Sequence, residues 1–125
     1  MRKIVMPLIM ASLVLTGCDE ERSQQVTATA YNSVKSQTQG NPALAAWGDI
    51  LKPGMKAIAV SRDLIAKGLT HGTEVEIEGL SGVYIVRDKM NKRWKDKIDI
   101  YMGTDVAAAR QWGQKTVTIT WAEAE

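Results

Sequence analysis

The chain has 125 residues, of which 45% are hydrophobic and 24% are charged, with 16 Lys and Arg against 14 Asp and Glu. Two of the basic residues, Arg2 and Lys3, stand at the N-terminus, so the rest of the chain is electrically neutral. A neutral chain has no long basic tract for nucleic acid or anionic lipid headgroups, and both partners are therefore disfavoured.

The first residues have the order of a secretory signal. After the basic start comes an apolar run, Ile4 to Leu15, and then the small residues Thr16 and Gly17. The apolar run is about a dozen residues long, whereas a helix that spans a bilayer needs about 20. We therefore expect residues 1–17 to be a signal peptide that is removed.

The only cysteine, Cys18, follows this segment directly. Leu15-Thr16-Gly17-Cys18 resembles the lipobox of bacterial lipoproteins, which implies cleavage before Cys18 and lipid on its sulfur. The alternative is a free or buried thiol, but a lone cysteine cannot form an internal disulfide, and oxidising compartments disfavour idle thiols. More than one acyl chain gives stable anchoring. We expect a lipid-anchored envelope protein that faces the periplasm, with the outer and inner membranes both open.

The polar residues 18–25 are expected to be a tether, which leaves residues 26–125 as one domain. A domain of about 100 residues can bury a core without metals or disulfides. Val26 to Tyr31 alternates and predicts a strand, followed by the polar loop 32–41.

The next segments combine a turn, a strand and a helix. Residues 42–54 have apolar residues at helical spacing but also Gly48 and Pro53, which indicates a broken helical turn. Lys56 to Val60 predicts a buried strand. Ser61 is a candidate N-cap for a helix over 62–67, in whose first turn Asp63 is more plausible as a helix-start residue than as a catalyst.

The second half of the domain predicts a β-hairpin and a further strand. Residues 73–78 and 83–87 alternate on either side of a Gly-bearing turn. In Lys97 to Tyr101, Asp99 faces away from Ile98 and Ile100, because successive side chains of a strand point to opposite faces.

The chain closes with a short helix and a final strand. Thr104 is a candidate N-cap for a helix that Gly113 ends. Residues 115–121 alternate as a half-buried strand. Five or six strands with two short helices predict a mainly β protein built as a small barrel.

Tryptophan and histidine carry no signal of a cofactor or metal site. Trp47, Trp112 and Trp121 are more typical of a core than of a ligand site. His71 is the only histidine and has no partner at metal-ligand or triad spacing, so it is interpreted as a loop residue.

Six segments, taken in order, resemble the 3D domain family, which is named for three aspartates and related to the catalytic part of the lytic transglycosylase MltA. They are Thr29-Ala30-Tyr31, Ile58-Ala59-Val60, Gly72-Thr73-Glu74-Val75, Val86-Arg87-Asp88, Ile98-Asp99-Ile100-Tyr101 and Trp112-Gly113. The resemblance implies a six-stranded double-psi β-barrel and a role in peptidoglycan turnover, by cleaving or rearranging glycan strands.

The resemblance also implies site residues. Asp88 is expected to be the catalytic acid, Asp99 its electrostatic partner, and Thr29 and Tyr31 substrate-binding residues beside a groove. The chain departs from the family pattern in two places: Ser61-Arg62 stands where relatives carry Asp-Pro, and Lys89-Met90 where they carry Thr-Gly.

A lytic transglycosylase needs one acid that stays protonated near neutral pH, through burial or a neighbouring carboxylate. Asp99 can be the neighbouring carboxylate that keeps Asp88 protonated. The cations Arg87 and Lys89 favour the ionised form, although a continuous strand would point them to the opposite face. The alternative for both aspartates is a pair of surface carboxylates bridged to this basic segment, which stabilises little.

Trp94 lies in a basic stretch with Lys92, Arg93 and Lys95. The stretch is either a solvated turn or a rim that binds the anionic peptide stems of peptidoglycan and stacks Trp94 on sugar.

Three functions remain open. The first is an envelope-anchored enzyme, similar to lytic transglycosylases, that acts on peptidoglycan. The second is a glycan-binding lipoprotein without catalysis, and the third is a structural envelope component.

Overall fold

The computed structural model describes residues 19–33 and 44–124. The predicted signal peptide, Cys18 and the loop residues 34–43 lie outside the described residues. Within the described part, no helix is long and apolar enough to cross a membrane.

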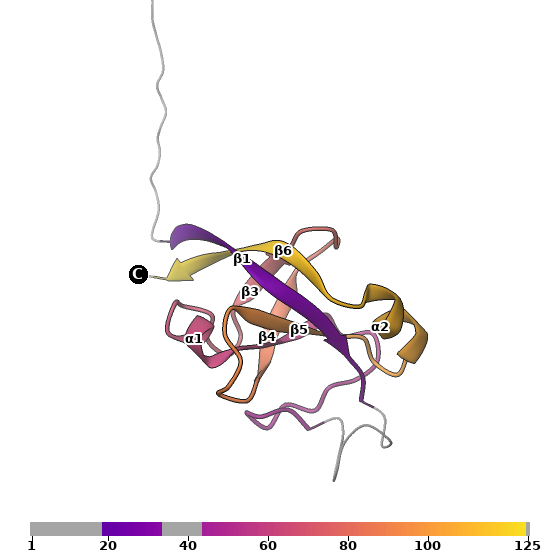
Figure 1. Ribbon diagram of the computed structural model, residues 1–125. Helices are drawn as coiled ribbons and strands as arrows, with labels where there is room; N and C mark the ends of the chain where they lie inside the picture. Colours follow the sequence, from indigo (N-terminus) through magenta and orange to yellow (C-terminus); the bar gives the residue numbers. More distant parts are fainter. Residues whose placement is uncertain (1–18, 34–43, 125) are drawn as a thin grey trace, which may run out of the picture.

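Six strands close into a barrel in the order β1-β5-β2-β4-β3-β6 (Figure 1). In chain order the elements are β1 (Asp19–Tyr31), β2 (Ala57–Val60), α1 (Arg62–Ile65), β3 (Glu74–Ile77), β4 (Tyr84–Lys89), β5 (Lys97–Tyr101), α2 (Val106–Trp112) and β6 (Lys115–Ala124). The prediction of a mainly β, six-stranded barrel with two short helices is confirmed.

The strand pairing has an internal symmetry. β1–β5 and β2–β4 are parallel pairs, whereas β2–β5, β1–β6, β3–β4 and β3–β6 are antiparallel. Exchanging β1, β2 and β3 with β4, β5 and β6 maps β1–β5 onto β2–β4 and β1–β6 onto β3–β4, and it leaves β2–β5 and β3–β6 unchanged. This topology agrees with the double-psi β-barrel that the family resemblance implied.

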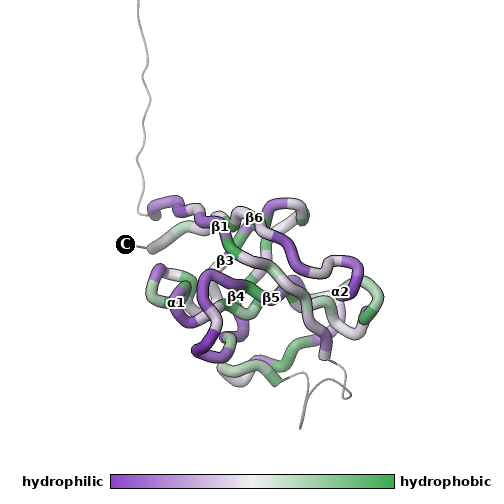
Figure 2. The backbone as a smooth tube through the Cα atoms, viewed as in Figure 1, coloured by the Kyte–Doolittle hydropathy of each residue, from purple (hydrophilic) through white to green (hydrophobic). Residues whose placement is uncertain are grey.

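Alternation along the strands fills the barrel interior, since every second side chain of a strand points to the same face. Figure 2 shows the hydrophobic segments along the strands and a hydrophilic loop between β4 and β5. The largest fully buried apolar residues are Ile58, Leu64, Leu69, Ile98, Ile100, Ile119, Val60, Val75 and Val86. Trp121 belongs to this core, and Trp47 and Trp112 pack against it, as predicted.

A second, smaller cluster lies on the outer side of the same strands. Its buried members are Ala45, Leu51, Ala57 and Tyr101. Ala57 and Tyr101 alternate with Ile58 and Ile100, which point inward, so they face outward. The segment before β2 therefore packs over the outside of the barrel.

The first strand begins much earlier than the sequence predicted. Residues 19–25, expected as a tether, form the start of β1 and pair with β6, from Asp19↔Ala124 to Gln25↔Thr118. Figure 1 shows the two strands running side by side toward the chain ends. Most of these side chains are exposed, so this ribbon needs no apolar alternation and is held by its backbone pairing with β6.

Two predictions of local structure were wrong. Residues 44–54 form no helical turn; Leu44 and Ile50 make an isolated antiparallel bridge around a turn in which Gly48 N–H donates to the Ala45 carbonyl. The N-cap of α2 is Asp105 rather than Thr104, because the Asp105 side chain accepts from the Ala108 N–H.

Candidate functional site

Cross-strand pairing places the predicted site residues in one row. Thr29 of β1 pairs with Asp99 of β5, and Asp99 pairs with Ala59 of β2. Ala59 also pairs with Asp88 of β4. Residues directly opposite one another share a face of the sheet, so the row runs Thr29, Asp99, Ala59, Asp88 across four strands. The methyl group of Ala59 separates two aspartates whose backbones lie roughly 10 Å apart.

A β-bulge at Arg87 turns Asp88 out of the barrel. The β2–β4 register passes from Ile58↔Val86 to Ala59↔Asp88, which leaves Arg87 without a partner in β2. Tyr84 and Val86 are buried, and uninterrupted alternation would point Asp88 inward as well. The extra residue moves Asp88 to the outer face instead.

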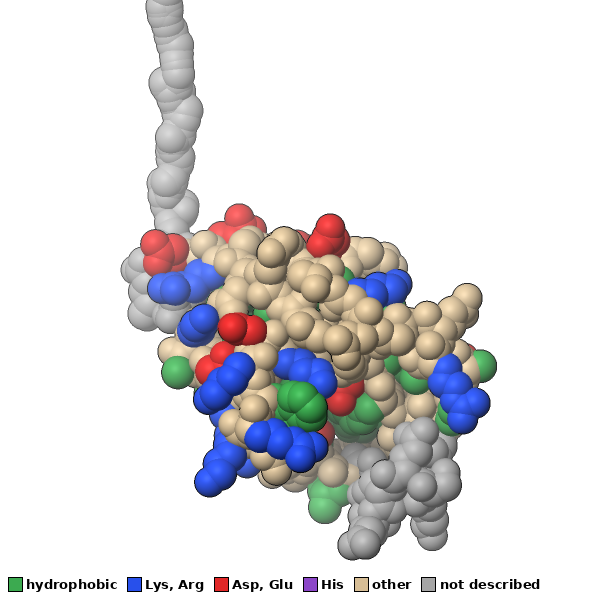
Figure 3. All heavy atoms as spheres, viewed as in Figure 1, with side chains coloured by type: hydrophobic (Ala, Val, Ile, Leu, Met, Phe, Trp, Pro, Cys, Tyr) green, Lys and Arg blue, Asp and Glu red, His purple; other side chains and the backbone are tan. Residues whose placement is uncertain are grey.

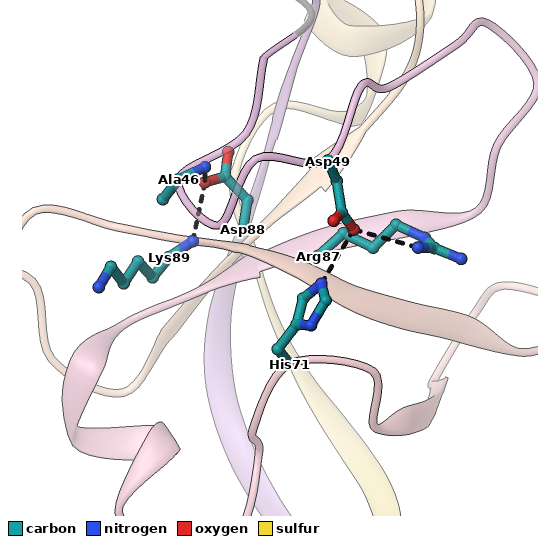
Figure 4. Close-up of polar contacts among 6 residues, drawn as sticks. All are labelled: Ala46, Asp49, His71, Arg87, Asp88 and Lys89. Atoms are coloured by element: carbon teal, nitrogen blue, oxygen red, sulfur yellow. Dashed lines mark hydrogen bonds and ion pairs between the residues drawn. The ribbon is translucent and has the colours of Figure 1, made fainter.

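The Asp88 carboxylate is held by backbone donors from two segments. Its Oδ1 accepts from the Ala46 N–H at 2.7 Å and from the Lys89 N–H at 2.9 Å (Figure 4). Burial raises the pKa of Asp88 above its ordinary value, and the charge of Asp49 adds to this, while the two N–H donors oppose it. Asp88 is thus a fixed carboxyl group that ionises less readily than a free aspartate.

Asp99 has a different environment. Its Oδ1 accepts from the Thr29 hydroxyl at 3.1 Å. Burial raises the pKa of Asp99, and the charge of Asp88 acts in the same direction, while the Thr29 hydrogen bond and the charge of Lys97 lower it. The two aspartates therefore influence each other electrostatically.

Tyr31 completes the group. Its hydroxyl is buried and has no hydrogen-bond partner among the residues that the structure describes. Burial raises the pKa of Tyr31, and the next causes are the charges of Asp88 and Asp99. Its ring lies tilted against that of Tyr101, with the centroids 5.6 Å apart. The structure thus brings together four predicted site residues: Thr29, Tyr31, Asp88 and Asp99.

A cluster around Asp49 fastens the segment that carries Ala46. Asp49 Oδ2 accepts from Arg87 at 3.1 Å and contacts His71 Nε2 at 3.0 Å (Figure 4). The hydrogen bonds to His71 and Arg87 lower the pKa of Asp49, so it stays ionised. The Trp47 ring lies 5.1 Å from that of His71. His71 is in a loop, as predicted, but the sequence had shown no partner for it.

Trp94, the fifth predicted site residue, lies in the loop between β4 and β5. Lys97 Nζ stands 3.7 Å from the centre of its ring. Lys97 is two residues before Asp99 in β5, so both side chains share the outer face. Trp94 is therefore connected to the row of site residues through Lys97.

Sequence reasoning missed three contributors to the site. Ala46 acts through its backbone N–H, and no side-chain pattern marks such a donor. Asp49 reaches His71 and Arg87 only through folding of the chain. Ala59 lies in the Ile58-Ala59-Val60 segment, and its small side chain is the signal that could have marked it as the residue between the two aspartates. Within the described ranges, no group of His, Cys, Asp and Glu could hold a metal ion.

No protein-family model and no curated protein matches the chain. Among solved structures it is similar to a mutant expansin of Clavibacter michiganensis in complex with cellohexaose, with 18% identity and a TM-score of 0.48. The apo expansin of the same organism gives 20% identity and a TM-score of 0.47. Both similarities cover 80% of this chain and 49% of the expansin chain, so this chain spans about half of the expansin's length.

Proposed function

We propose that this protein binds peptidoglycan glycan strands on the outer face of its barrel, over Tyr31, Asp88 and Asp99. The observation that carries the proposal is the convergence of two carboxyl groups with a buried tyrosine hydroxyl that has no partner in the described part of the chain. Sugar hydroxyls both donate and accept hydrogen bonds. They can donate to the carboxylates and accept from Tyr31, which would satisfy a polar group that is costly to leave unpaired.

The proposal includes the location. The signal-like N-terminus and Cys18 support a lipid anchor in the cell envelope, with the barrel in the periplasm. Because β1 begins at Asp19, directly after Cys18 in sequence, the anchor would hold the barrel close to the membrane.

A second candidate function is lytic cleavage of the bound strand. It is favoured by the raised pKa of Asp88 and of Asp99, since a general acid must keep its proton near neutral pH. One acid would protonate the glycosidic oxygen, and its carboxylate would then take the proton of the muramic C6 hydroxyl as the 1,6-anhydro ring closes. Two backbone N–H donors favour the ionised form of Asp88, whereas Asp99 accepts from one hydroxyl among the residues that the structure describes. The hydrogen bonds therefore favour Asp99 as the acid, where the sequence favoured Asp88.

Binding and cleavage can be tested in one experiment. Full-length protein is incubated with purified glycan strands whose peptide stems have been removed, and the bound fraction is measured by co-sedimentation. Asp88→Ala should weaken binding roughly ten- to a hundredfold, because a hydrogen bond to a charged group contributes roughly 1.5–3 kcal/mol. Glu76→Gln, an exposed carboxyl on β3, is the matched control and should bind as wild type does.

The same incubation reports cleavage. Products with 1,6-anhydro ends, detected by mass spectrometry in wild type and absent with Asp99→Asn, would establish the lytic function. Binding without such products would leave the glycan-binding function. Equal affinity of wild type and Asp88→Ala would contradict the proposed site.

A further inference from the structure

The loop between β4 and β5 carries a concentration of positive charge. We call residues 89–97 the basic loop; its cations are Lys89, Lys92, Arg93, Lys95 and Lys97. Among the described residues, none of these five side chains forms an ion pair. Figure 3 shows basic side chains gathered around an apolar patch on this side of the molecule. The exposed cations Lys92, Arg93 and Lys95 are therefore available to an external anion, whereas the charge of Lys97 also acts on Asp99.

The basic loop has a defined shape because the start of α1 holds it. The holding contacts, each 3.0 Å long, run from Ser61, Arg62 and Asp63 to three backbone groups of the loop. They are Lys97 N–H to Ser61 Oγ, Arg62 Nε–H to the Met90 carbonyl, and Asp96 N–H to Asp63 Oδ2. Ser61 is fully buried, and its hydroxyl accepts from the loop and makes no side-chain cap hydrogen bond to α1. A loop fixed in this way presents its charges with less loss of entropy on binding.

The two departures from the family pattern meet in these contacts. Ser61-Arg62 and Lys89-Met90 are far apart in sequence, yet Arg62 donates directly to the Met90 carbonyl. Ser61 accepts from Lys97 at the other end of the loop. The residues that depart from the family pattern, Ser61-Arg62 and Lys89-Met90, thus belong to one hydrogen-bonded unit, which includes the cationic loop.

The basic loop borders the proposed glycan site at both of its ends. Lys89 directly follows Asp88, and its Nζ lies 5.4 Å from the centre of the Trp47 ring. Lys97 is two residues before Asp99 on the same face, and it lies over Trp94 together with Arg93, whose guanidinium is 4.8 Å from the ring centre. These three cation–aromatic contacts hold positive charge at the two ends of the loop, beside the two aspartates.

Resting on the proposed function, we propose that the basic loop binds the carboxylates of peptide stems, so that the protein prefers glycan strands that still carry stems. A polymer with carboxylates at regular intervals matches a row of cations that form no ion pair within the described residues and lie beside a sugar site. Each exposed contact contributes little alone, and salt screens it, so several must act together. The aspartates would contact the sugars, and the basic loop would determine which strands are bound.

The test compares two kinds of strand and two matched variants of the full-length protein. Lys92→Gln/Arg93→Gln/Lys95→Gln removes three exposed charges of the basic loop. The control changes three exposed lysines outside it to glutamine: Lys52, Lys56 and Lys115. Affinity is measured by co-sedimentation with stem-bearing strands and with stem-free strands, at low and high salt.

Wild type and the control should bind stem-bearing strands about tenfold more tightly than stem-free strands at low salt, and this preference should shrink at high salt. The basic-loop variant should lose the preference and still bind stem-free strands as wild type does. Equal affinity of wild type for both strands would overturn this inference alone, whereas no binding to either would overturn the proposed function as well. A parallel arm uses phosphatidylglycerol vesicles. Loop-dependent binding to these, without a preference for stems, would assign the basic loop to the membrane instead.

Discussion

Ala46→Pro isolates the backbone hydrogen bond that fixes Asp88. Ala46 follows the first residue of a turn closed by Gly48 N–H to the Ala45 carbonyl, and proline is favoured at that second position. The substitution therefore suits the turn but removes the N–H that donates to Asp88 Oδ1 at 2.7 Å.

The expected change in the free energy of unfolding of Ala46→Pro follows from two opposing effects. A hydrogen bond to a charged acceptor contributes about 1.5–3 kcal/mol, and its loss destabilises ionised Asp88. Proline restricts the unfolded chain, which stabilises the folded protein by about 0.4–1 kcal/mol. We expect Ala46→Pro to lower the free energy of unfolding at neutral pH by about 1–2 kcal/mol, with a further rise in the pKa of Asp88.

The assay is chemical denaturation together with a carbon-13 NMR titration of the Asp88 carboxyl group. Ala46→Gly keeps the N–H and is the control, so its Asp88 should titrate as in wild type. If Ala46→Pro leaves the pKa of Asp88 unchanged while the turn stays folded, the backbone donor does not hold this carboxylate and the reasoning fails.

Three further substitutions test the surroundings of the site. Burial raises the folded-state pKa of Asp99, so the stability that Asp99 contributes is complete below the ordinary Asp pKa and is lost as pH rises through the folded-state pKa. Asp99→Asn should therefore be more stable than wild type in urea denaturation at neutral pH. A less stable variant would contradict this. Tyr31→Phe removes a buried hydroxyl without a described partner, so stability should stay the same or rise by about 1 kcal/mol while glycan affinity falls; unchanged affinity would exclude Tyr31 from the site. Ser61→Ala leaves the Lys97 N–H without its acceptor and should cost about 1–3 kcal/mol in thermal unfolding, a loss that a surface serine such as Ser81 would not show.

Most of the barrel could be predicted because its signals are local. Alternation in segments such as 97–101 and 115–121 follows directly from one buried and one exposed face. Residues 19–25 carry no such alternation, since their pairing depends on β6 at the far end of the chain. Local patterns therefore missed half of β1.

The candidate site could be predicted only in part. The resemblance named Asp88 and Asp99, but periodicity could not reveal the bulge at Arg87 that places both on one face, because a bulge is defined by the partner strand. Nor could it show that Ala46 donates to Asp88. The side chains of this site are visible in the sequence, whereas the backbone geometry that orients them is not.

The most direct test of the central claim is an NMR titration of carbon-13- and nitrogen-15-labelled protein with a stem-free glycan oligosaccharide. Binding on the proposed face predicts the largest shift changes at Thr29, Tyr31, Asp88 and Asp99, with little change on β3. Shift changes centred on β3, or none at millimolar ligand, would contradict the claim that this outer face of the barrel binds glycan.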